Sequence, residues 1–233
     1  MTRQEFLKQL PQLAKDYKPA PDVGKHLSNL TLVIIVGSSG VGKTSLMYKL
    51  GLSYIVADNT RLPRPEEKEG IDYHFRQDYD KVVEDLKGGR FVQVAIDSSR
   101  DLKATRDSSF PDSGIAIMAV VYDAVPIFRS LGFKNTISIH VTPPSFDEWM
   151  RRLEAHKLSM EYQIRRLSGA ARTLEFALND KQMHFVLNDN LQAAAAQVKG
   201  ILNGKIDIER EGQAKKIAQQ LLEYVQYNKD LTK

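Results

Sequence analysis

The sequence predicts an α/β fold in which helices cover both faces of a mostly parallel sheet. The first observation is an apolar, partly β-branched run at 32–36, the pattern of a strand that is buried on both faces. The second is the glycine-rich stretch GSSGVGKTSL at 37–46, which follows that run without a gap. The third is the alternation of strand and helix patterns further along the chain, since such alternation is typical of parallel sheets.

The individual elements follow from the spacing of the apolar residues. Helical spacing at 1–17 predicts an N-terminal helix, which ends at the stretch KPAPDVG. Further strands are predicted at 91–96, 115–121, 136–141 and 184–187. Helices are predicted at 43–50, 79–86, 146–155, 161–177 and 191–202, with a last helix beyond Gly204. We expect a main domain at 31–204, with one helical extension at 1–30 and another at 205–233.

The composition narrows the class of protein. The 233 residues include no cysteine, which excludes a disulfide framework and a thiolate metal site. Apolar residues make up 42% and charged residues 27%, the values of an ordinary globular chain. No apolar run approaches the roughly 20 residues of a membrane-spanning helix, and the first residues lack the core of a signal peptide. We expect a soluble, cytoplasmic protein without a membrane partner.

The glycine-rich stretch fits the phosphate-binding pattern G-x-x-x-x-G-K-[ST] between a strand and a helix. Its backbone amides and the helix N-terminus would form an anion cradle. Lys43 is expected to reach the β- and γ-phosphates of ATP, and Thr44 to offer its hydroxyl to Mg²⁺. The alternative is a glycine-rich turn with an incidental lysine. The predicted ATP-binding residues are Gly37, Ser38, Ser39, Gly40, Val41, Gly42, Lys43, Thr44 and Ser45.

A second stretch, NTRLPRPEEKEGIDYHF at 59–75, resembles the T-T-R-x-P-R-x-G-E-x-x-G-x-D-Y-x-F signature of guanylate kinases. The positions that match in register are Thr60, Arg61, Pro63, Arg64, Glu67, Gly70, Asp72, Tyr73 and Phe75. The resemblance implies that Arg61, Arg64 and Tyr73 hold the phosphate of an acceptor nucleotide, because forked arginine donors and a hydroxyl suit a dianion. The alternative is a basic surface loop with ordinary ion pairs. The resemblance also implies an acceptor-binding subdomain at about 58–114 and a lid at about 154–164.

Fainter similarity to the same family continues in HVTPPSFDEWMRRL at 140–153, IRRLSGAARTLEFA at 164–177 and FVLNDNLQAAAAQVKGIL at 185–202. By register, Arg152 and Arg166 take the places of lid arginines that neutralise the transferring phosphoryl group, a catalytic role that is electrostatic. Asn188 and Asp189 take places on the adenine side. The stretch Ala155-His156-Lys157 stands where the family has another arginine.

The residues that would read the acceptor base depart from the family pattern. Gln93 stands where the family has a glutamate against guanine, Lys103 replaces a tyrosine, and Thr105 keeps a hydroxyl. An amide offers one acceptor and one donor, whereas guanine presents two adjacent donors, so Gln93 predicts weaker guanine selectivity. Two alternatives remain open: Gln93 packs away from the base, or a carboxylate restores the acceptor pair, the candidates being Asp97, Asp101 and Asp123.

Together these features predict a nucleoside monophosphate kinase of guanylate kinase type, which transfers the γ-phosphoryl group of ATP to a nucleoside monophosphate, GMP by resemblance. Mg²⁺ is the expected cofactor. The formal net charge of +4 suits nucleotide phosphates, and no nucleic-acid partner is expected. The terminal helices are candidate surfaces for a protein partner. The alternatives are a catalytically weak module that binds a nucleotide or a phosphorylated partner, and a nucleotide-dependent regulator; the complete Gly-Lys-Thr loop favours the enzyme.

Overall fold

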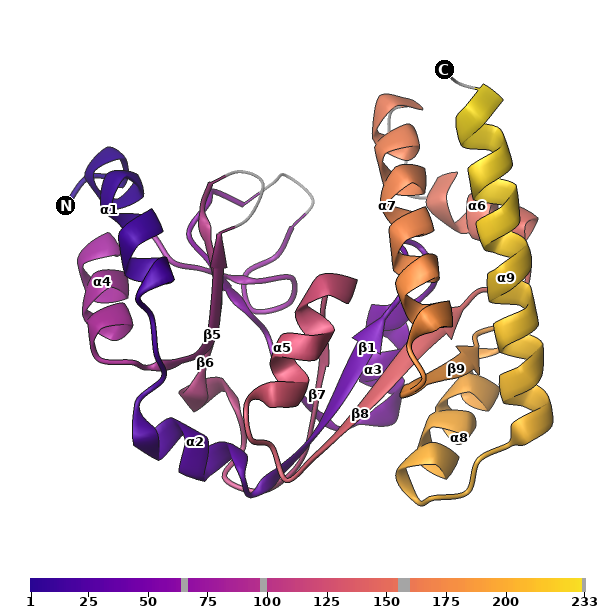
Figure 1. Cartoon of the computed structure of the whole chain (residues 1–233), viewed down its shortest axis with the longest axis horizontal. Helices are drawn as coiled ribbons and strands as arrows, with labels where there is room; N and C mark the ends of the chain where they lie inside the picture. The colour runs from indigo at the N-terminus through magenta and orange to yellow at the C-terminus, as the bar shows by residue number, and fades with distance from the viewer. Residues whose placement is uncertain (64–66, 97–99, 155–159, 232–233) are drawn as a thin grey trace. The chain divides into compact units, whose positions relative to one another are not determined.

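The computed structural model describes residues 1–63, 67–96, 100–154 and 160–231, without the side chains at 160–168 and 228–231. The chain divides into two compact units, whose elements are labelled in Figure 1. Unit 1 comprises Met1–Thr31, Ser53–Ala116 and Ile127–Asn135, and unit 2 comprises Leu32–Leu52, Ile117–Pro126 and Thr136–Lys233. The N-terminal segment therefore belongs to the same unit as the whole range of the predicted acceptor-binding subdomain.

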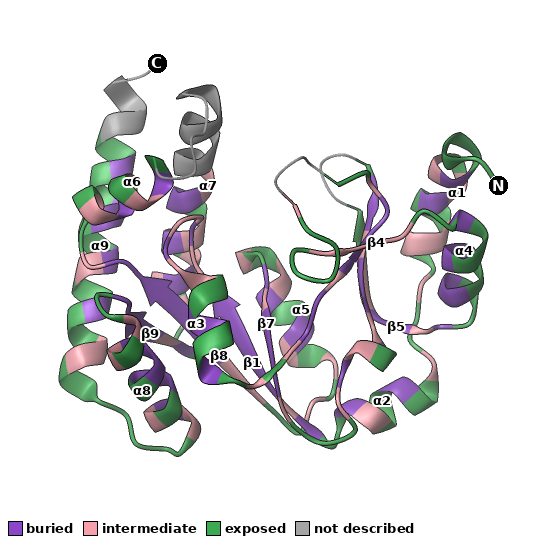
Figure 2. Ribbon diagram, turned by 180° about the vertical axis from the view of Figure 1, so that it is seen from behind, coloured by how far each residue is buried: buried purple, intermediate pink, exposed green. Residues whose placement is uncertain are grey.

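A five-stranded sheet has the strand order β2-β7-β1-β8-β9. Its strands are β1 Leu30–Val36, β2 Ser53–Tyr54, β7 Gly114–Ala119, β8 Asn135–Thr142 and β9 Met183–Leu187. β1 and β9 are buried almost throughout, as the purple colour in Figure 2 shows, and β8 and β9 pair in parallel. The predicted α/β fold with a mostly parallel sheet flanked by helices is confirmed.

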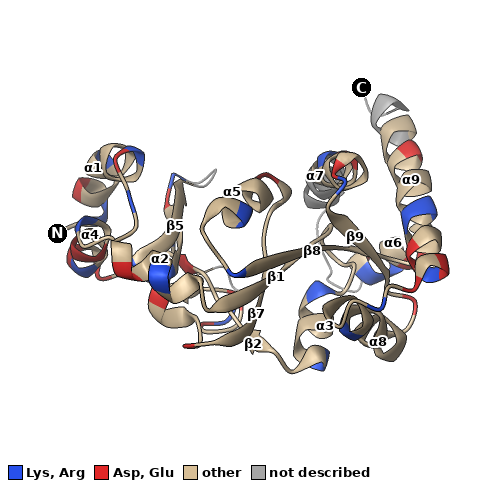
Figure 3. Ribbon diagram, turned by 60° about the horizontal axis from the view of Figure 1, so that its bottom comes forward, with Lys and Arg blue, Asp and Glu red and all other residues tan. Residues whose placement is uncertain are grey.

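Helices of unit 2 lie on both sides of its strands. They are α3 Lys43–Leu50, α6 Phe146–Glu154, α7 Met160–Asn179, α8 Leu191–Leu202 and α9 Ile208–Leu231. Figure 3 shows α3 and α8 on one side of β8 and β9, and α7 on the other. α9 packs against α7 and β9. A short 3₁₀ turn, Tyr122–Ala124, leads into α5 Val125–Ser130, which the sequence patterns did not indicate.

Unit 1 contains a second sheet with the strand order β4-β3-β6-β5. Its strands are β3 Asp58–Asn59, β4 His74–Phe75, β5 Phe91–Ile96 and β6 Leu102–Arg106. The predicted strand at 91–96 is confirmed as β5, but it pairs antiparallel with β6 and is not part of the mostly parallel sheet. β3 and β4 have two residues each, too few to give an alternating apolar pattern, which is why sequence patterns miss this sheet.

Two helices of unit 1 cover one face of this second sheet. These two helices are α1 Arg3–Lys15 and α4 Tyr79–Lys87, which supply most of the apolar cluster, and the shorter α2 Pro21–Leu27 contacts β5. The cluster consists of Phe6, Leu10, Tyr79, Val82, Val83, Leu86, Phe91, Leu102 and Ala104. The predicted N-terminal helix is confirmed, and a capping box of Thr2 and Glu5 satisfies its first amides.

In the described part of the chain, no helix combines the length and the apolar character that a membrane crossing requires.

Candidate active site

The glycine-rich loop connects β1 to α3, as the sequence predicts. Gly37, Gly40 and Gly42 have φ angles of 149°, 80° and 94°. A Cβ atom at Gly40 would lie 2.9 Å from the Leu153 side chain in α6, and one at Gly42 would collide with the Asn188 amide. Both the backbone conformation and the elements packed against the loop therefore require glycine at these two positions.

The ammonium group of Lys43 is folded over the loop. Its Nζ donates to the carbonyl oxygens of Gly37 and Ser38, at 2.7 and 2.8 Å. Thr44 and Ser45 lie exposed in the first turn of α3. A lysine, two hydroxyl groups and the positive end of a helix dipole are thus gathered at one loop, which is an arrangement suited to a bound polyphosphate.

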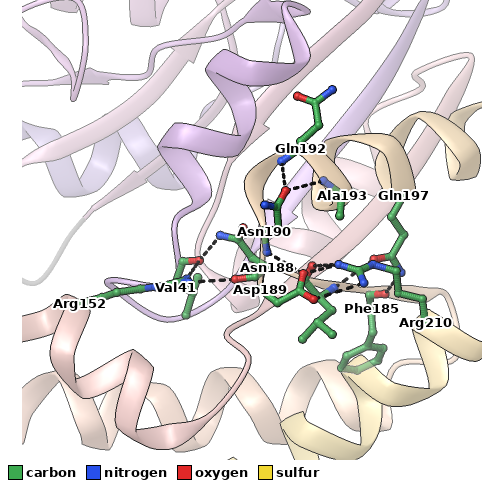
Figure 4. A network of polar contacts seen from close by, with 11 residues as sticks. Val41, Arg152, Phe185, Asn188, Asp189, Asn190, Gln192, Ala193, Gln197 and Arg210 are labelled. Carbon is green, nitrogen blue, oxygen red and sulfur yellow. Dashed lines mark hydrogen bonds and ion pairs between the residues drawn. The ribbon is translucent and has the colours of Figure 1, made fainter.

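Side chains from outside the loop hold it by its carbonyl oxygens. Asn188 Nδ2 donates to Val41 O at 2.7 Å, and Trp149 Nε1 in α6 donates to Ser39 O at 2.7 Å. Arg152 Nη1 donates to Val41 O at 3.4 Å, and its Nη2 donates to Asn188 O at 3.0 Å. Figure 4 shows Arg152 and Asn188 meeting at Val41. The predicted catalytic arginine of α6 therefore contacts the phosphate-binding loop.

Glu148 orients this arginine. Its Oε1 accepts a hydrogen bond from Arg152 Nε at 2.8 Å, while Arg151 Nε donates to Oε2 at 2.6 Å. The hydrogen bonds from Arg151, and then from Arg152, lower the pKa of Glu148 to about 2. Glu148 is therefore ionised at neutral pH and keeps the guanidinium of Arg152 in place beside the loop.

The positive charge of Lys43 affects the pKa of a buried histidine in β8. His140 is almost fully buried, and its Nδ1 lies 3.1 Å from Thr142 Oγ1. Burial, followed by the positive charge of Lys43, lowers the pKa of His140 to about 3. His140 is therefore neutral at physiological pH, and it adds no second positive charge to that of the lysine.

In unit 1, strand register places the predicted acceptor residues on one face of the second sheet. Gln93 of β5 is the cross-strand partner of Thr105 in β6, and Lys103 is opposite both Ala95 and Asn59. Cross-strand partners point to the same side of a sheet, and alternate residues point to opposite sides. Leu102 and Ala104 face α1 and α4, so these five residues belong to the opposite face, which we call the acceptor face. Gln93 is half-buried there, and Thr105 is buried.

Arg61 and Tyr73 lie together next to Lys103. Arg61 makes a bidentate ion pair with Glu67, with Nη1–Oε2 at 2.6 Å and Nη2–Oε1 at 2.5 Å. The guanidinium carbon of Arg61 lies 5.4 Å from the centre of the Tyr73 ring, and Lys103 Nζ lies 5.3 Å from the same centre. Two cations therefore approach one aromatic ring. Glu67 fixes the fork of Arg61 and balances its charge.

Two of the carboxylates that the sequence offers as base-reading residues do not lie on the acceptor face next to Gln93 in the strand register. Asp101 is fully buried, with Oδ2 accepting from Arg3 of α1 at 2.6 Å and Oδ1 accepting from Thr60 Oγ1 at 3.3 Å. Asp101 thus ties the N-terminal helix to the sheet. Asp123 lies exposed in the 3₁₀ turn after β7, beyond the end of the strand at Ala119. Asp97 lies outside the described residues.

Comparison with known proteins identifies the family. The sequence model described as guanylate kinase matches residues 29–205. The chain belongs to the guanylate kinase family. The prediction of an ATP-binding kinase with a phosphate-binding loop is thereby confirmed.

Individual relatives agree with this assignment. The chain is 30% identical over 182 residues to "Guanylate kinase" of Psychrobacter arcticus, covering 74% of this chain and 85% of the relative. It is 31% identical to "Guanylate kinase 1" of rice, Oryza sativa subsp. japonica, covering 73% of this chain but only about half, 47%, of the rice protein. The crystal structure of guanylate kinase from Anaplasma phagocytophilum matches with a TM-score of 0.53 at 19% identity, covering 78% and 88% of the two chains, and supports the fold.

The residues of this family member fit a magnesium ion that is carried by a nucleotide. Within the described ranges, no group of three or more His, Cys, Asp or Glu side chains could hold a metal ion. Mg²⁺, however, commonly binds through substrate phosphates, waters and one or two protein oxygens. The exposed hydroxyl of Thr44 at the start of α3 suits that mode of binding.

Several predicted site residues are not described. Arg64 and the stretch Ala155-His156-Lys157 lie outside the described residues, and Arg166 is described only by its backbone in α7. Sequence reasoning missed Trp149 and Glu148 in α6 and His140 in β8. A tryptophan or glutamate beside two arginines carries no signal in a sequence, because its role depends on a loop that is far away in the chain.

Proposed function

We propose that the chain is an ATP-dependent kinase of nucleoside monophosphates, with GMP as the acceptor to be expected from its family. The single observation that carries the proposal is the loop between β1 and α3, whose lysine Nζ is already held at 2.7 and 2.8 Å from two loop carbonyl oxygens. A module that binds a phosphorylated partner without catalysis has no need for the complete Gly-Lys-Thr loop, over which Lys43 lies.

On the donor side, the loop amides and the N-terminus of α3 bind the phosphates of ATP. Lys43 exchanges the carbonyl oxygens of Gly37 and Ser38 for phosphate oxygens, so that its charge opposes the charge that grows on the γ-phosphoryl group. Mg²⁺, when bound, neutralises and orients the phosphates. Thr44 contributes its hydroxyl to that ion. Arg152 and Arg166 are the proposed cations that neutralise the negative charge of the phosphoryl group during its transfer.

On the acceptor side, the phosphate of the nucleoside monophosphate binds at Arg61, Arg64 and Tyr73. The bidentate pair with Glu67 supports this role for Arg61, because it holds the guanidinium against the Tyr73 ring. Lys103 adds a further positive charge at the same ring. The reaction attaches the γ-phosphoryl group of ATP to an oxygen of this phosphate and releases ADP and a nucleoside diphosphate.

The base of the acceptor binds along the pair formed by Gln93 and Thr105. This pair is the next same-face pair along β5 and β6 from Ala95 and Lys103, so base and phosphate would lie along one line on the acceptor face. Asp101 accepts hydrogen bonds from Arg3 and Thr60, which favours Gln93 as the group that faces the base. We therefore propose weaker discrimination in favour of guanine than a glutamate would give.

A coupled assay of ADP release tests this function. The protein is given ATP and Mg²⁺ with each of a panel of ribo- and deoxynucleoside monophosphates, and the nucleoside diphosphate is quantified separately. We expect equal amounts of ADP and nucleoside diphosphate with GMP, and measurable turnover with at least one other purine monophosphate. Binding of ATP without transfer to any acceptor would instead support the catalytically weak module.

A cytoplasmic location and the absence of a nucleic-acid partner stay predictions from the sequence.

A further inference from the structure

The C-terminal helix α9 is bonded to the turn that follows β9. The helix begins at Ile208, after residue 205, where the match to the family model ends. Near its start, Arg210 Nη2 donates to Leu187 O at 3.1 Å and forms an ion pair with Asp189, while Nη1 lies 3.4 Å from Asp189 Oδ2. One guanidinium thus bonds the last residue of β9 and the second residue of the turn. Figure 4 shows Arg210 and Asp189 facing each other.

The residue between these two partners is the one that holds the phosphate-binding loop. Asn188 is buried, its backbone N–H donates to Thr142 O at 2.8 Å, and its side chain donates to Val41 O at 2.7 Å. Because Arg210 bonds to Leu187 and Asp189 on either side, it restricts the position of Asn188 from both neighbours. A chain of direct polar contacts and adjacent residues therefore runs from α9 to the loop.

The ion pair is maintained at neutral pH. Burial raises the pKa of Asp189, but the hydrogen bond from Arg210, the hydrogen bond from Asn190 N–H and the positive charge of Arg210 act against it, and the pKa lies below its usual value. Asn190 in turn caps α8 by accepting from the backbone amides of Gln192 and Ala193, at 2.9 and 3.1 Å. The turn is thus fixed at α8 as well as at α9, with Asn188 between the two attachments.

The adjacent residue of α9 provides a contrast. Glu211 Oε1 accepts from Phe185 N–H and lies near His184 Nδ1, both at 3.1 Å. These contacts satisfy the edge of β9, which is the last strand of its sheet, and they do not reach the turn. Two neighbouring charged residues on one helix therefore have different targets, one a strand edge and the other the turn beside the loop.

We propose that Arg210 is a positioning residue of the donor-nucleotide site, which makes α9 part of that site. By fixing Leu187 and Asp189, it holds Asn188 against Val41 and keeps the loop amides in the arrangement that binds polyphosphate. The inference rests on the proposed function in that ATP is taken to occupy the loop. Under it, loss of Arg210 weakens the binding of ATP and leaves the binding of the acceptor unchanged.

Titration calorimetry of ATP with Mg²⁺, and separately of GMP, tests the proposal on the unmodified protein, Arg210→Met and Glu211→Gln. Arg210→Met is expected to weaken ATP binding about tenfold, within the range of indirect couplings, with unchanged GMP affinity. Glu211→Gln is the matched control, which is expected to lower the Tm without weakening the binding of ATP. Unchanged ATP affinity in Arg210→Met, or an equal loss in Glu211→Gln, would overturn the proposal. Failure of the unmodified protein to bind ATP would contradict the proposed function instead.

A double-mutant cycle with Asp189→Asn gives a second test. Because Arg210 acts in part through Asp189, Arg210→Met is expected to cost less ATP affinity in the Asp189→Asn background than in the unmodified protein. Fully additive losses would contradict the coupling. Arg210→Lys replaces Arg210→Met throughout if the latter does not fold, and an intermediate loss is expected, because an ammonium keeps the charge but not the fork.

Discussion

The donor and acceptor residues are held in place by different means. In unit 2, the loop at 37–42 is fixed through its backbone, because Trp149, Arg152 and Asn188 all bond to main-chain carbonyl oxygens. In unit 1, the acceptor face depends on side chains, since Arg61 is fixed by Glu67 and Gln93 is placed by its pairing opposite Thr105. A site made of backbone tolerates little change in geometry, whereas a site made of side chains can change its ligand through single substitutions.

This contrast accounts for the pattern of resemblance to the family. The loop retains every residue of the phosphate-binding motif, whereas the resemblance implies a glutamate and a tyrosine where the acceptor face has Gln93 and Lys103. We therefore expect substitutions in unit 2 to remove catalysis and substitutions in unit 1 to redirect or weaken the binding of the acceptor.

The largest effect is expected for Lys43→Ala. Lys43 places its charge where negative charge grows during transfer, so we expect kcat to fall about 100- to 1000-fold. Rates of ADP release measure the loss, and Tm checks the fold. Lys49→Ala is the matched control, because Lys49 is exposed in the last turn of the same helix. Turnover of Lys43→Ala at the level of this control would mean that the loop is not the donor site.

A smaller and differently distributed effect is expected for Arg61→Ala. A charge-assisted hydrogen bond to phosphate contributes about 1.5–3 kcal/mol, so the KM of the acceptor should rise about ten- to a hundredfold while the KM of ATP changes little. Lys87→Ala, an exposed lysine at the end of α4, is the control. An equal rise in the KM of ATP and of the acceptor would assign Arg61 to the donor site. It would also contradict the division of donor binding and acceptor binding between unit 2 and unit 1.

Lys103→Met tests whether the lysine at position 103, where the family resemblance implies a tyrosine, contributes to binding of the acceptor phosphate. Lys103 Nζ lies 5.3 Å from the Tyr73 ring centre, close to the proposed position of the acceptor phosphate. We expect a rise of about three- to tenfold in the KM of the acceptor, without a change for ATP, because a half-exposed charge contributes less than a buried fork. An unchanged KM would show that Lys103 only covers the ring.

The buried His140 of unit 2 should make the free energy of unfolding sensitive to acid. The pKa of His140 is about 3 when folded against 6.5 when unfolded, so the unfolded chain binds the proton first. Stability that is fully present above pH 6.5 should therefore fall as the pH drops towards 3. His140→Gln should remove up to about 1.4 kcal/mol per pH unit of this dependence, measured by urea unfolding between those limits. Identical pH slopes in the two proteins would contradict a buried, neutral histidine.

Local features of the fold and the donor site could be predicted from the sequence. The loop and α3 are contiguous, so their spacing alone indicates the strand, the turn and the helix. The contact of Arg152 with Val41 could not be predicted from spacing, because the two residues are 111 positions apart and only the folded chain brings them together.

The acceptor face was less predictable for a related reason. Which residues share a face follows from register, and β3 and β4 are too short to reveal their register in the sequence. Asp101 accepts a hydrogen bond from Arg3, which lies 98 positions earlier in the sequence, in a helix that carries no motif. Sequence alone thus left Asp101 open as a base-reading residue, and its burial beside α1 gives it a structural role.

The most direct test of the account measures kcat/KM for GMP and AMP with ATP and Mg²⁺, in the unmodified protein and in Gln93→Glu. A mismatched buried polar group costs about 1–3 kcal/mol, so Gln93→Glu should raise the preference for GMP over AMP by a factor of about five to 150. The unmodified protein should turn over both nucleotides, and the variant should show this gain. Strong guanine selectivity in the unmodified protein that Gln93→Glu leaves unchanged would contradict it.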